Sequence, residues 1–169
     1  KREGYKEFSI LPAAMAEVQR QSLSCKVVVV GPPFNRSEVE LFGRHGVSSL
    51  FERHSLDDAQ LRNAYANCTM VVQTSRYEGF GMTPLEGMAS GAPVVVAKTS
   101  AMPEVGGRVA RYFEPGSADS LAVELEALLG DLALQSDLGK RGVERARLFT
   151  AQLMAERTAA AYRSVISAS

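Results

Sequence analysis

The sequence predicts a single α/β domain built on a doubly wound parallel sheet, and three observations support this prediction. Short apolar runs rich in valine alternate with segments of helical periodicity, which is the pattern of a parallel sheet covered by helices on both faces. The 169 residues, 46% hydrophobic and 22% charged, have the size and composition of one globular domain. No repeat, low-complexity segment or internal linker divides them. We therefore treat residues 1–169 as one domain.

Five strands are expected from runs of β-branched or apolar residues, at 25–31, 47–53, 69–73, 93–97 and 110–113. The first run, CKVVVVG, contains four consecutive valines and ends in glycine, so it is expected to be buried on both faces. The second run, VSSLFER, is the weakest strand pattern of the five.

Helical patterns occupy the intervening segments, at 7–18, 36–46, 55–68, 83–90, 117–131 and 132–169. In the first of these, Leu11, Met15 and Val18 share one helical face, and Pro12 falls in the first turn, where its missing N–H is tolerated. The last stretch includes a separate C-terminal helix at 151–169.

The charge balance and the length of the apolar runs exclude several classes of partner. Nineteen basic and nineteen acidic residues cancel, so no overall field attracts nucleic acid. The longest apolar runs are short, so no segment is expected to span a bilayer. The start KREGYKEF lacks the apolar core of a signal peptide, and we expect it to be cut from a longer chain. Two scattered cysteines, Cys25 and Cys68, favour a reducing, cytoplasmic location over a disulfide.

Ligands of such sheets bind beyond the carboxyl ends of the strands, which directs attention to two loops. In GPPFNRSE, Gly31 is followed by two prolines and does not match G-x-G-x-x-G, which argues against a nicotinamide site. The other loop, TSRYEGFGMTPLE, places Glu78 and Glu86 around two glycines, Gly79 and Gly81. This loop is the better candidate for a binding site.

Local rules explain part of that glycine-rich corner. Thr83 suits a helix N-cap, Pro84 the first helical position and Glu86 the third, which together predict a capping box. This structural interpretation accounts for Glu86 but leaves Glu78 and the glycines unexplained. A glycine turn feeding a helix N-terminus directs N–H groups at one spot, which suits a phosphate. Carboxylates beside it would accept hydrogen bonds from sugar hydroxyls, so the corner predicts a nucleotide-sugar site.

The segment YEGFGMTPLEGMASGAPVVVAKTSAMPEV, residues 77–105, resembles the E-x7-E signature of retaining GT-B glycosyltransferases. The whole chain is similar to the C-terminal, nucleotide-sugar donor-binding domain of glycosyltransferase family 4. The opening KREGYK resembles the start of a mannosyltransferase-like subset of that family. The resemblance implies a Rossmann-like domain of a GT-B fold and a hexosyltransferase, in which this domain alone would be inactive. It also implies an acceptor-binding N-terminal domain outside this chain. The C-terminal helix would pack either on the present domain or on that N-terminal domain.

The resemblance also assigns roles to individual residues. Arg2 and Lys6 match the basic pair that neutralises the donor diphosphate, and Glu78 matches the glutamate that contacts the transferred sugar. Glu86 matches the glutamate that accepts from the ribose hydroxyls, a role compatible with capping. The remaining donor-binding positions are the backbone groups of Gly79, Phe80, Gly81, Met82 and Thr83, with Gly31 and residues 50–53 bordering the base.

The donor and acceptor implied by this resemblance are a GDP-mannose or UDP-sugar and a glycan or lipid-linked acceptor. No cofactor and no metal are expected, and His45 and His54 lack partners at ligand spacing. The full-length protein would work in the cytoplasm, in peripheral contact with the inner face of the membrane. Two other interpretations stay open: another nucleotide-sugar enzyme of the same architecture, such as an epimerase or a phosphorylase, and a non-catalytic nucleotide-binding module.

Overall fold

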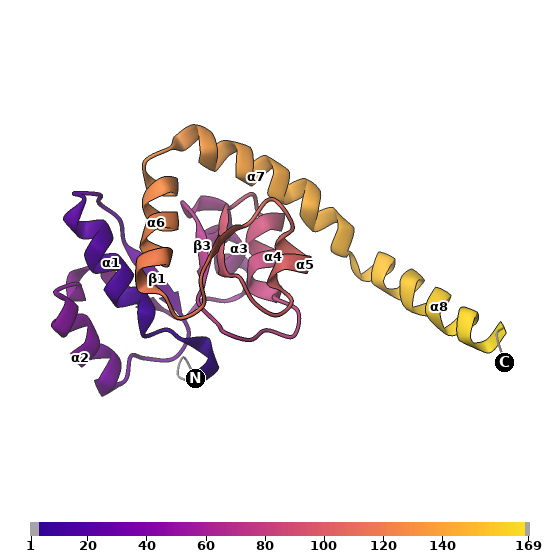
Figure 1. Ribbon diagram of the computed structural model, residues 1–169, viewed down its shortest axis with the longest axis horizontal. Helices are drawn as coiled ribbons and strands as arrows, with labels where there is room; N and C mark the ends of the chain where they lie inside the picture. Colours follow the sequence, from indigo (N-terminus) through magenta and orange to yellow (C-terminus); the bar gives the residue numbers. More distant parts are fainter. Residues whose placement is uncertain (1–3, 168–169) are drawn as a thin grey trace.

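The computed structural model describes residues 4–167 and contains the predicted alternation of strands and helices (Figure 1). The strands are β1 (Val27–Val30), β2 (Phe51–His54), β3 (Val71–Gln73), β4 (Val94–Ala97) and β5 (Arg111–Phe113). All five predicted strands are therefore present. Four lie inside their predicted segments, and β2 extends one residue beyond its own.

Eight α-helices and three short 3-10 turns lie before, between and after the strands in the described chain. The α-helices are α1 (Ile10–Arg20), α2 (Arg36–His45), α3 (Asp58–Asn67), α4 (Met82–Ala89), α5 (Met102–Gly106), α6 (Ala118–Leu129), α7 (Leu132–Ala146) and α8 (Ala151–Ser167). The 3-10 turns are η1 (Gly4–Lys6), η2 (Ser48–Leu50) and η3 (Arg147–Phe149). The sequence pattern did not predict α5.

The helix ends follow local capping rules. The side chain of Asn35 accepts from the Glu38 amide at the start of α2, and Asp57 accepts from the Gln60 amide at the start of α3, each within a capping box. Gly46 ends α2 in the left-handed conformation, with φ of 71°. The predicted end of α2 at residue 46 is thus confirmed, and α3 begins inside its predicted segment, 55–68.

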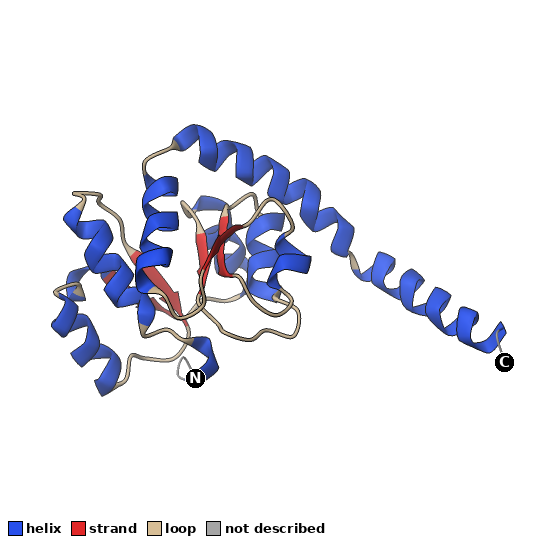
Figure 2. Ribbon diagram, viewed as in Figure 1, coloured by secondary structure: helices blue, strands red, loops and turns tan. Residues whose placement is uncertain are grey.

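Strand pairing is parallel throughout but is divided between two sheets. β1 pairs with β2, and β4 lies between β3 and β5. Strand β4 is buried on both faces, because Val95 and Ala97 join one apolar cluster while Val94 and Val96 join the other. Helices α1 and α6 pack together over the first cluster, and α4 and α5 supply the second (Figure 2). The doubly wound arrangement is therefore confirmed around β4.

The prediction that β1 is buried on both faces is wrong. Val29 is buried, but Val28 is 52% exposed and Val30 is 43% exposed. Helix α3, which follows β2 in the chain, buries none of its residues and packs beside α4, which is consistent with the exposure of Val28 and Val30. Alternating burial along β1 marks a strand covered from one side only.

The C-terminal helix α8 extends away from the rest of the domain (Figure 1). It contacts η3 near its own start, and its apolar side chains Met154, Tyr162, Val165 and Ile166 are exposed. Helix α7, in contrast, packs along α4. No helix within residues 4–167 is long and apolar enough to cross a membrane.

Candidate functional site

Glu78 lies in the loop between β3 and α4, at the carboxyl end of the strand. Its Oε1 atom accepts a hydrogen bond from Lys6 Nζ at 2.5 Å and another from Gln73 Nε2 at 2.5 Å. The Glu78 side chain is 15% exposed and that of Lys6 is 35% exposed, so the ion pair is partly shielded from water. The fold thus joins Lys6 and Glu78, two predicted site residues that are 72 positions apart in the chain.

The surroundings of Glu78 favour its ionised form. Burial acts to raise the pKa of this carboxyl, but hydrogen bonds from Lys6, Ser75 and Gln73 and the positive charge of Lys6 outweigh it. The pKa of Glu78 is consequently lowered from its ordinary value. The site therefore holds a negative charge at neutral pH, next to a lysine.

Backbone contacts fix the N-terminal segment that carries Lys6 against the Glu78 loop. The Arg76 amide donates to the Tyr5 carbonyl at 2.7 Å, and the Thr74 hydroxyl donates to the Lys6 carbonyl at 2.7 Å. The Arg76 guanidinium also pairs with the carboxylate of Glu7. The position of Lys6 is therefore set by tertiary contacts and not by its own side chain alone.

A second segment supports the same loop from the other side. The hydroxyl of Ser100 donates to the Glu78 carbonyl at 2.6 Å, and that of Thr99 donates to the Arg76 carbonyl at 3.0 Å. Ser100 adopts a positive φ of 53°, which is uncommon for a residue with a side chain. Hydrogen bonds therefore hold the backbone of Glu78 as well as its carboxylate.

Helix α4 begins earlier than the predicted capping box requires. Gly81 is the N-cap, with φ of 94°, and Leu85 donates to its carbonyl at 3.2 Å. Thr83 is the second helical residue, and no side chain caps this helix. The prediction of a capping box from Thr83 to Glu86 is thus wrong, because the left-handed glycine turns the chain into the helix two residues sooner. The amides of exposed Met82 and Thr83 fall in the first turn, which has no intrahelical acceptors.

The half-buried Glu86 does not cap α4, and its side chain contacts Tyr65 of helix α3. Its Oε2 atom accepts a hydrogen bond from the Tyr65 hydroxyl at 3.1 Å. Burial and the neighbouring Glu86 carboxylate raise the pKa of Tyr65 to about 12. Tyr65 therefore remains a neutral donor at physiological pH and fixes one oxygen of Glu86.

Gly31 and the end of β2 form a separate contact at the end of β1. The Arg53 Nε donates to the Gly31 carbonyl at 2.6 Å, and the Gly31 amide donates to the His54 carbonyl at 3.0 Å. Within residues 4–167, no hydrogen bond joins Gly31 or Arg53 to the Glu78 loop. Arg2 lies outside the described residues.

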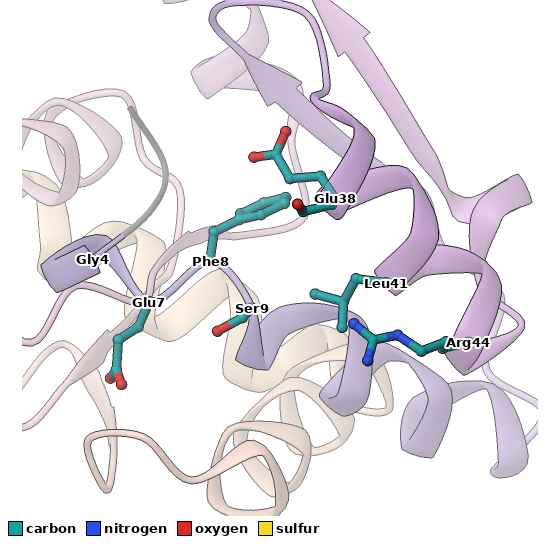
Figure 3. A pocket seen from close by; sticks show the side chains of 8 residues that line it. Gly4, Glu7, Phe8, Ser9, Glu38, Leu41 and Arg44 are labelled. Carbon is teal, nitrogen blue, oxygen red and sulfur yellow. The ribbon is translucent and has the colours of Figure 1, made fainter.

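A hollow of about 260 Å³ lies between the N-terminal segment and helix α2 (Figure 3). It is lined by Gly4, Glu7, Phe8, Ser9, Ser37, Glu38, Leu41 and Arg44. None of the predicted site residues that the structure describes lines this hollow. Apart from Gly31, these residues lie instead on the Glu78 loop, on α4 and on the N-terminal segment at Lys6, and among them Gly79, Met82 and Thr83 are exposed.

The described residues contain no cluster of three or more His, Cys, Asp or Glu side chains that could hold a metal ion. Cys25 and Cys68 are free thiols, and burial raises the pKa of each. The predicted absence of a metal requirement stays a prediction.

Sequence reasoning missed three residues that shape the site: Gln73, Tyr65 and Ser100. Gln73 carries a usable signal, because it is the one polar residue at the end of the run MVVQ, directly before the loop. Tyr65 stands one turn beyond Leu61 on a helix, which by itself indicates only packing. Nothing in the sequence pattern points to Ser100.

A parallel α/β domain that carries charged side chains on a loop at the carboxyl end of a strand belongs to the class of α/β ligand-binding domains. The family model described as glycosyl transferases group 1 matches residues 2–131, and the chain belongs to that family. The fold is that of the Rossmann-like domains of GT-B glycosyltransferases.

Two relatives illustrate the sequence similarity. An MMP alpha-(1->4)-mannosyltransferase from Mycolicibacterium hassiacum is 34% identical over 133 residues, which are 76% of this chain and 32% of the relative. The O-antigen chain mannosyltransferase B of Escherichia coli is 31% identical over 106 residues, which are 63% of this chain and 28% of the relative. The chain thus spans about a third of the length of these relatives.

The crystal structure of HepE from Anabaena in complex with UDP superimposes with a TM-score of 0.84 at 22% identity. The alignment covers 97% of this chain and 47% of that chain. At this identity the likeness establishes the shared fold.

Proposed function

We propose that this chain is the donor-binding domain of a retaining glycosyltransferase. The enzyme would move a hexose, with mannose as the first candidate, from a nucleotide-diphosphate sugar to a glycan or lipid-linked acceptor. Two relatives named mannosyltransferases and a neighbour solved with UDP support this proposal. The acceptor would bind largely to a part of the protein outside this chain, and the exposed face of α8 would contact that part.

The observation that carries the proposal is the contact between Lys6 and Glu78 beside the first turn of α4. The loop that carries the ionised Glu78 carboxylate leads into the N-terminus of an eight-residue helix, and Lys6 contacts this loop from the N-terminal segment. The helix dipole and free amides favour a phosphate, while a carboxylate favours sugar hydroxyls. A nucleotide-diphosphate sugar carries both groups, so it matches both halves of this surface.

The two residues of the Lys6–Glu78 ion pair would contact different parts of the donor. A diphosphate carries more negative charge than one carboxylate, so it would draw Lys6 Nζ toward itself when the donor binds. Lys6, together with Arg2, would then stabilise the charge that develops on the leaving diphosphate. Glu78 would be released to contact the transferred sugar.

Glu86 and the backbone around it would complete the donor site. Because Glu86 Oε2 is occupied by Tyr65, we assign the ribose hydroxyls to its other oxygen. The backbone of Gly79, Phe80 and Gly81 would approach the sugar and phosphates, and the amides of Met82 and Thr83 would add donors. Gly31 would border the base.

Binding of free nucleotide tests the proposal on this chain. We expect UDP or GDP to bind weakly and to keep the same affinity when a chelator is added, because cationic side chains and the helix start replace a metal. Isothermal titration with and without EDTA measures this. Loss of binding in EDTA would contradict the metal-independent site, and absence of UDP and GDP binding under all conditions would contradict the proposed function.

Substitution Glu86→Gln is expected to weaken nucleotide binding without destabilising the fold. The amide oxygen can still accept from Tyr65, and no cap is lost because Glu86 does not cap α4. A hydrogen bond to a charged group is worth about 1.5–3 kcal/mol, so we expect UDP or GDP affinity to fall by about 10- to 150-fold.

Calorimetric titration and thermal melting measure the two effects of Glu86→Gln. Glu40→Gln, on the exposed face of α2, is the matched control and should change neither. A large drop in melting temperature with unchanged affinity would make Glu86 a purely structural residue.

A further inference from the structure

Gln73 is the last residue of β3, a strand whose other residues are valines. It pairs in register with Val96 of the buried strand β4, and its side chain is half-buried. A polar side chain in such a place needs a hydrogen-bond partner, because an unpaired amide away from water is costly. The partner that the fold provides is the Glu78 carboxylate, five residues further along the chain.

Gln73 and Lys6 donate to the same carboxylate atom. Gln73 Nε2 and Lys6 Nζ both lie 2.5 Å from Glu78 Oε1. The two donors differ in what a ligand does to them: an anionic ligand attracts the charged lysine, whereas the neutral amide stays where the sheet places it. Gln73 is therefore the donor that keeps Oε1 in place when Lys6 is drawn away, in addition to the hydrogen bond that the Ser75 hydroxyl makes to the same carboxylate.

We propose that Gln73 is a positioning residue for the glycosyl transfer: it holds the Glu78 carboxylate in its ligand-facing orientation after Lys6 has moved to the diphosphate. The proposal rests on the donor-binding function proposed above. It assigns Gln73 no contact with substrate and no proton transfer. Its effect reaches the reaction through the orientation and the charge state of Glu78.

Two properties of the site make this role effective. The backbone of Glu78 is already held by Ser100, so the direction of its carboxylate depends on the neutral donors Gln73 and Ser75 once Lys6 has moved. Gln73 sits on a strand and not on the loop, and groups on regular elements position a site more accurately than groups on loops. Its hydrogen bond also favours the ionised carboxylate.

The test compares Gln73→Met with a matched control on the same chain. Methionine has nearly the same length and shape but cannot donate. Gln135→Met is the control, because Gln135 Nε2 donates to the Leu128 carbonyl at 2.6 Å, between α7 and α6 and away from the Glu78 loop. The readouts are the carboxyl carbon chemical shift of Glu78 against pH, and titrations with UDP, GDP, UDP-glucose and GDP-mannose.

We expect Gln73→Met to raise the pKa of Glu78. We also expect it to lower the affinity for the sugar nucleotide that binds to the unmodified chain by about tenfold, while the affinity for the corresponding free nucleotide stays within twofold. Gln135→Met should leave the Glu78 titration and both affinities unchanged even if it lowers the melting temperature. An unmoved Glu78 titration in Gln73→Met, or equal loss of free nucleotide and sugar nucleotide, would overturn the role of Gln73. If the unmodified chain binds neither kind of ligand, the proposed function fails, whereas the titration of Glu78 still tests the contact itself.

Discussion

Replacing Gly81 by alanine is expected to destabilise the domain by about 2–4 kcal/mol and to remove nucleotide binding. Gly81 has φ of 94°, a region in which a side chain costs on the order of 1–3 kcal/mol. A Cβ atom there would also overlap with Cε of Met102, which is 1% exposed. The Met102 side chain is flexible, but it is enclosed in the second apolar cluster and can move only by disturbing that packing. A change in the backbone at residue 81 and a displacement of Met102 would each shift the start of α4.

Alanine substitutions at two other glycines separate the backbone cost of a positive φ from the cost of the overlap with Met102. Gly46 has φ of 71° and open space around its missing side chain, so Gly46→Ala should show the backbone cost alone, about 1 kcal/mol. Gly79 has no positive φ, and no atom lies within 4 Å of the place that a Cβ would take, so Gly79→Ala should leave stability nearly unchanged. Denaturant unfolding of the three variants beside the unmodified chain measures the series.

Ligand titration completes the comparison. Since the fold gives no reason for glycine at position 79, we attribute it to close approach of the donor and expect Gly79→Ala to weaken sugar-nucleotide binding in a folded protein. If Gly81→Ala lowers the free energy of unfolding by no more than Gly46→Ala does, the overlap with Met102 does not contribute to stability. A Gly79→Ala variant that binds normally would remove Gly79 from the donor site.

The order of the strands and most helix ends could be predicted because local rules determine them. The valines of β4 and the glycine after α2 are examples, since each follows from the pattern of a few neighbouring residues. Burial of β1 could not be predicted in the same way. Four valines are consistent with a strand covered on both sides, and only the packing of the folded chain leaves Val28 and Val30 exposed.

The same contrast applies to the site. The pattern T-P-L-E satisfies the rule for a capping box, but Gly81 precedes it and offers a left-handed turn that starts the helix earlier. The residues Glu78 and Glu86 could be selected from sequence, whereas their partners could not. Lys6 and Tyr65 meet these carboxylates through tertiary contacts that no local pattern encodes, although the family resemblance had already placed Lys6 near the donor. Gln73 lies five residues from Glu78, and its polar side chain at the end of a valine-rich strand was the one local signal.

In the full-length glycosyltransferase proposed above, Glu78→Ala is expected to lower the turnover number by about 100-fold or more, while this domain keeps its affinity for free UDP or GDP. Free nucleotide lacks the sugar that Glu78 is proposed to contact, so binding loses no interaction. The substitution also releases Lys6 from its ion pair and removes a negative charge beside the diphosphate. Affinity for free nucleotide should therefore stay level or rise, as turnover falls. Removal of one preorganised electrostatic group commonly costs a factor of this size.

The expected role of Glu78 differs from that of a glycosidase nucleophile. Retaining glycosidases use two carboxyl groups about 5–5.5 Å apart, one of which attacks the sugar. Glu86 does not fit as the second member, because Tyr65 holds it on α4 at the position proposed for the ribose. We therefore expect Glu78 to orient the sugar and to stabilise positive charge at its ring, with Lys6 and Arg2 on the leaving diphosphate.

Steady-state kinetics of the full-length enzyme with Glu78→Ala and Glu78→Gln, together with nucleotide titration of the same variants, measure this division of roles. Glutamine can still accept from Lys6 and Gln73, so Glu78→Gln should keep the loop in place and isolate the loss of charge. Glu40→Gln serves again as the distant control. Parallel loss of turnover and of free-nucleotide affinity in Glu78→Ala would move Glu78 to the nucleotide side of the site, and a normal turnover number would remove it from the reaction.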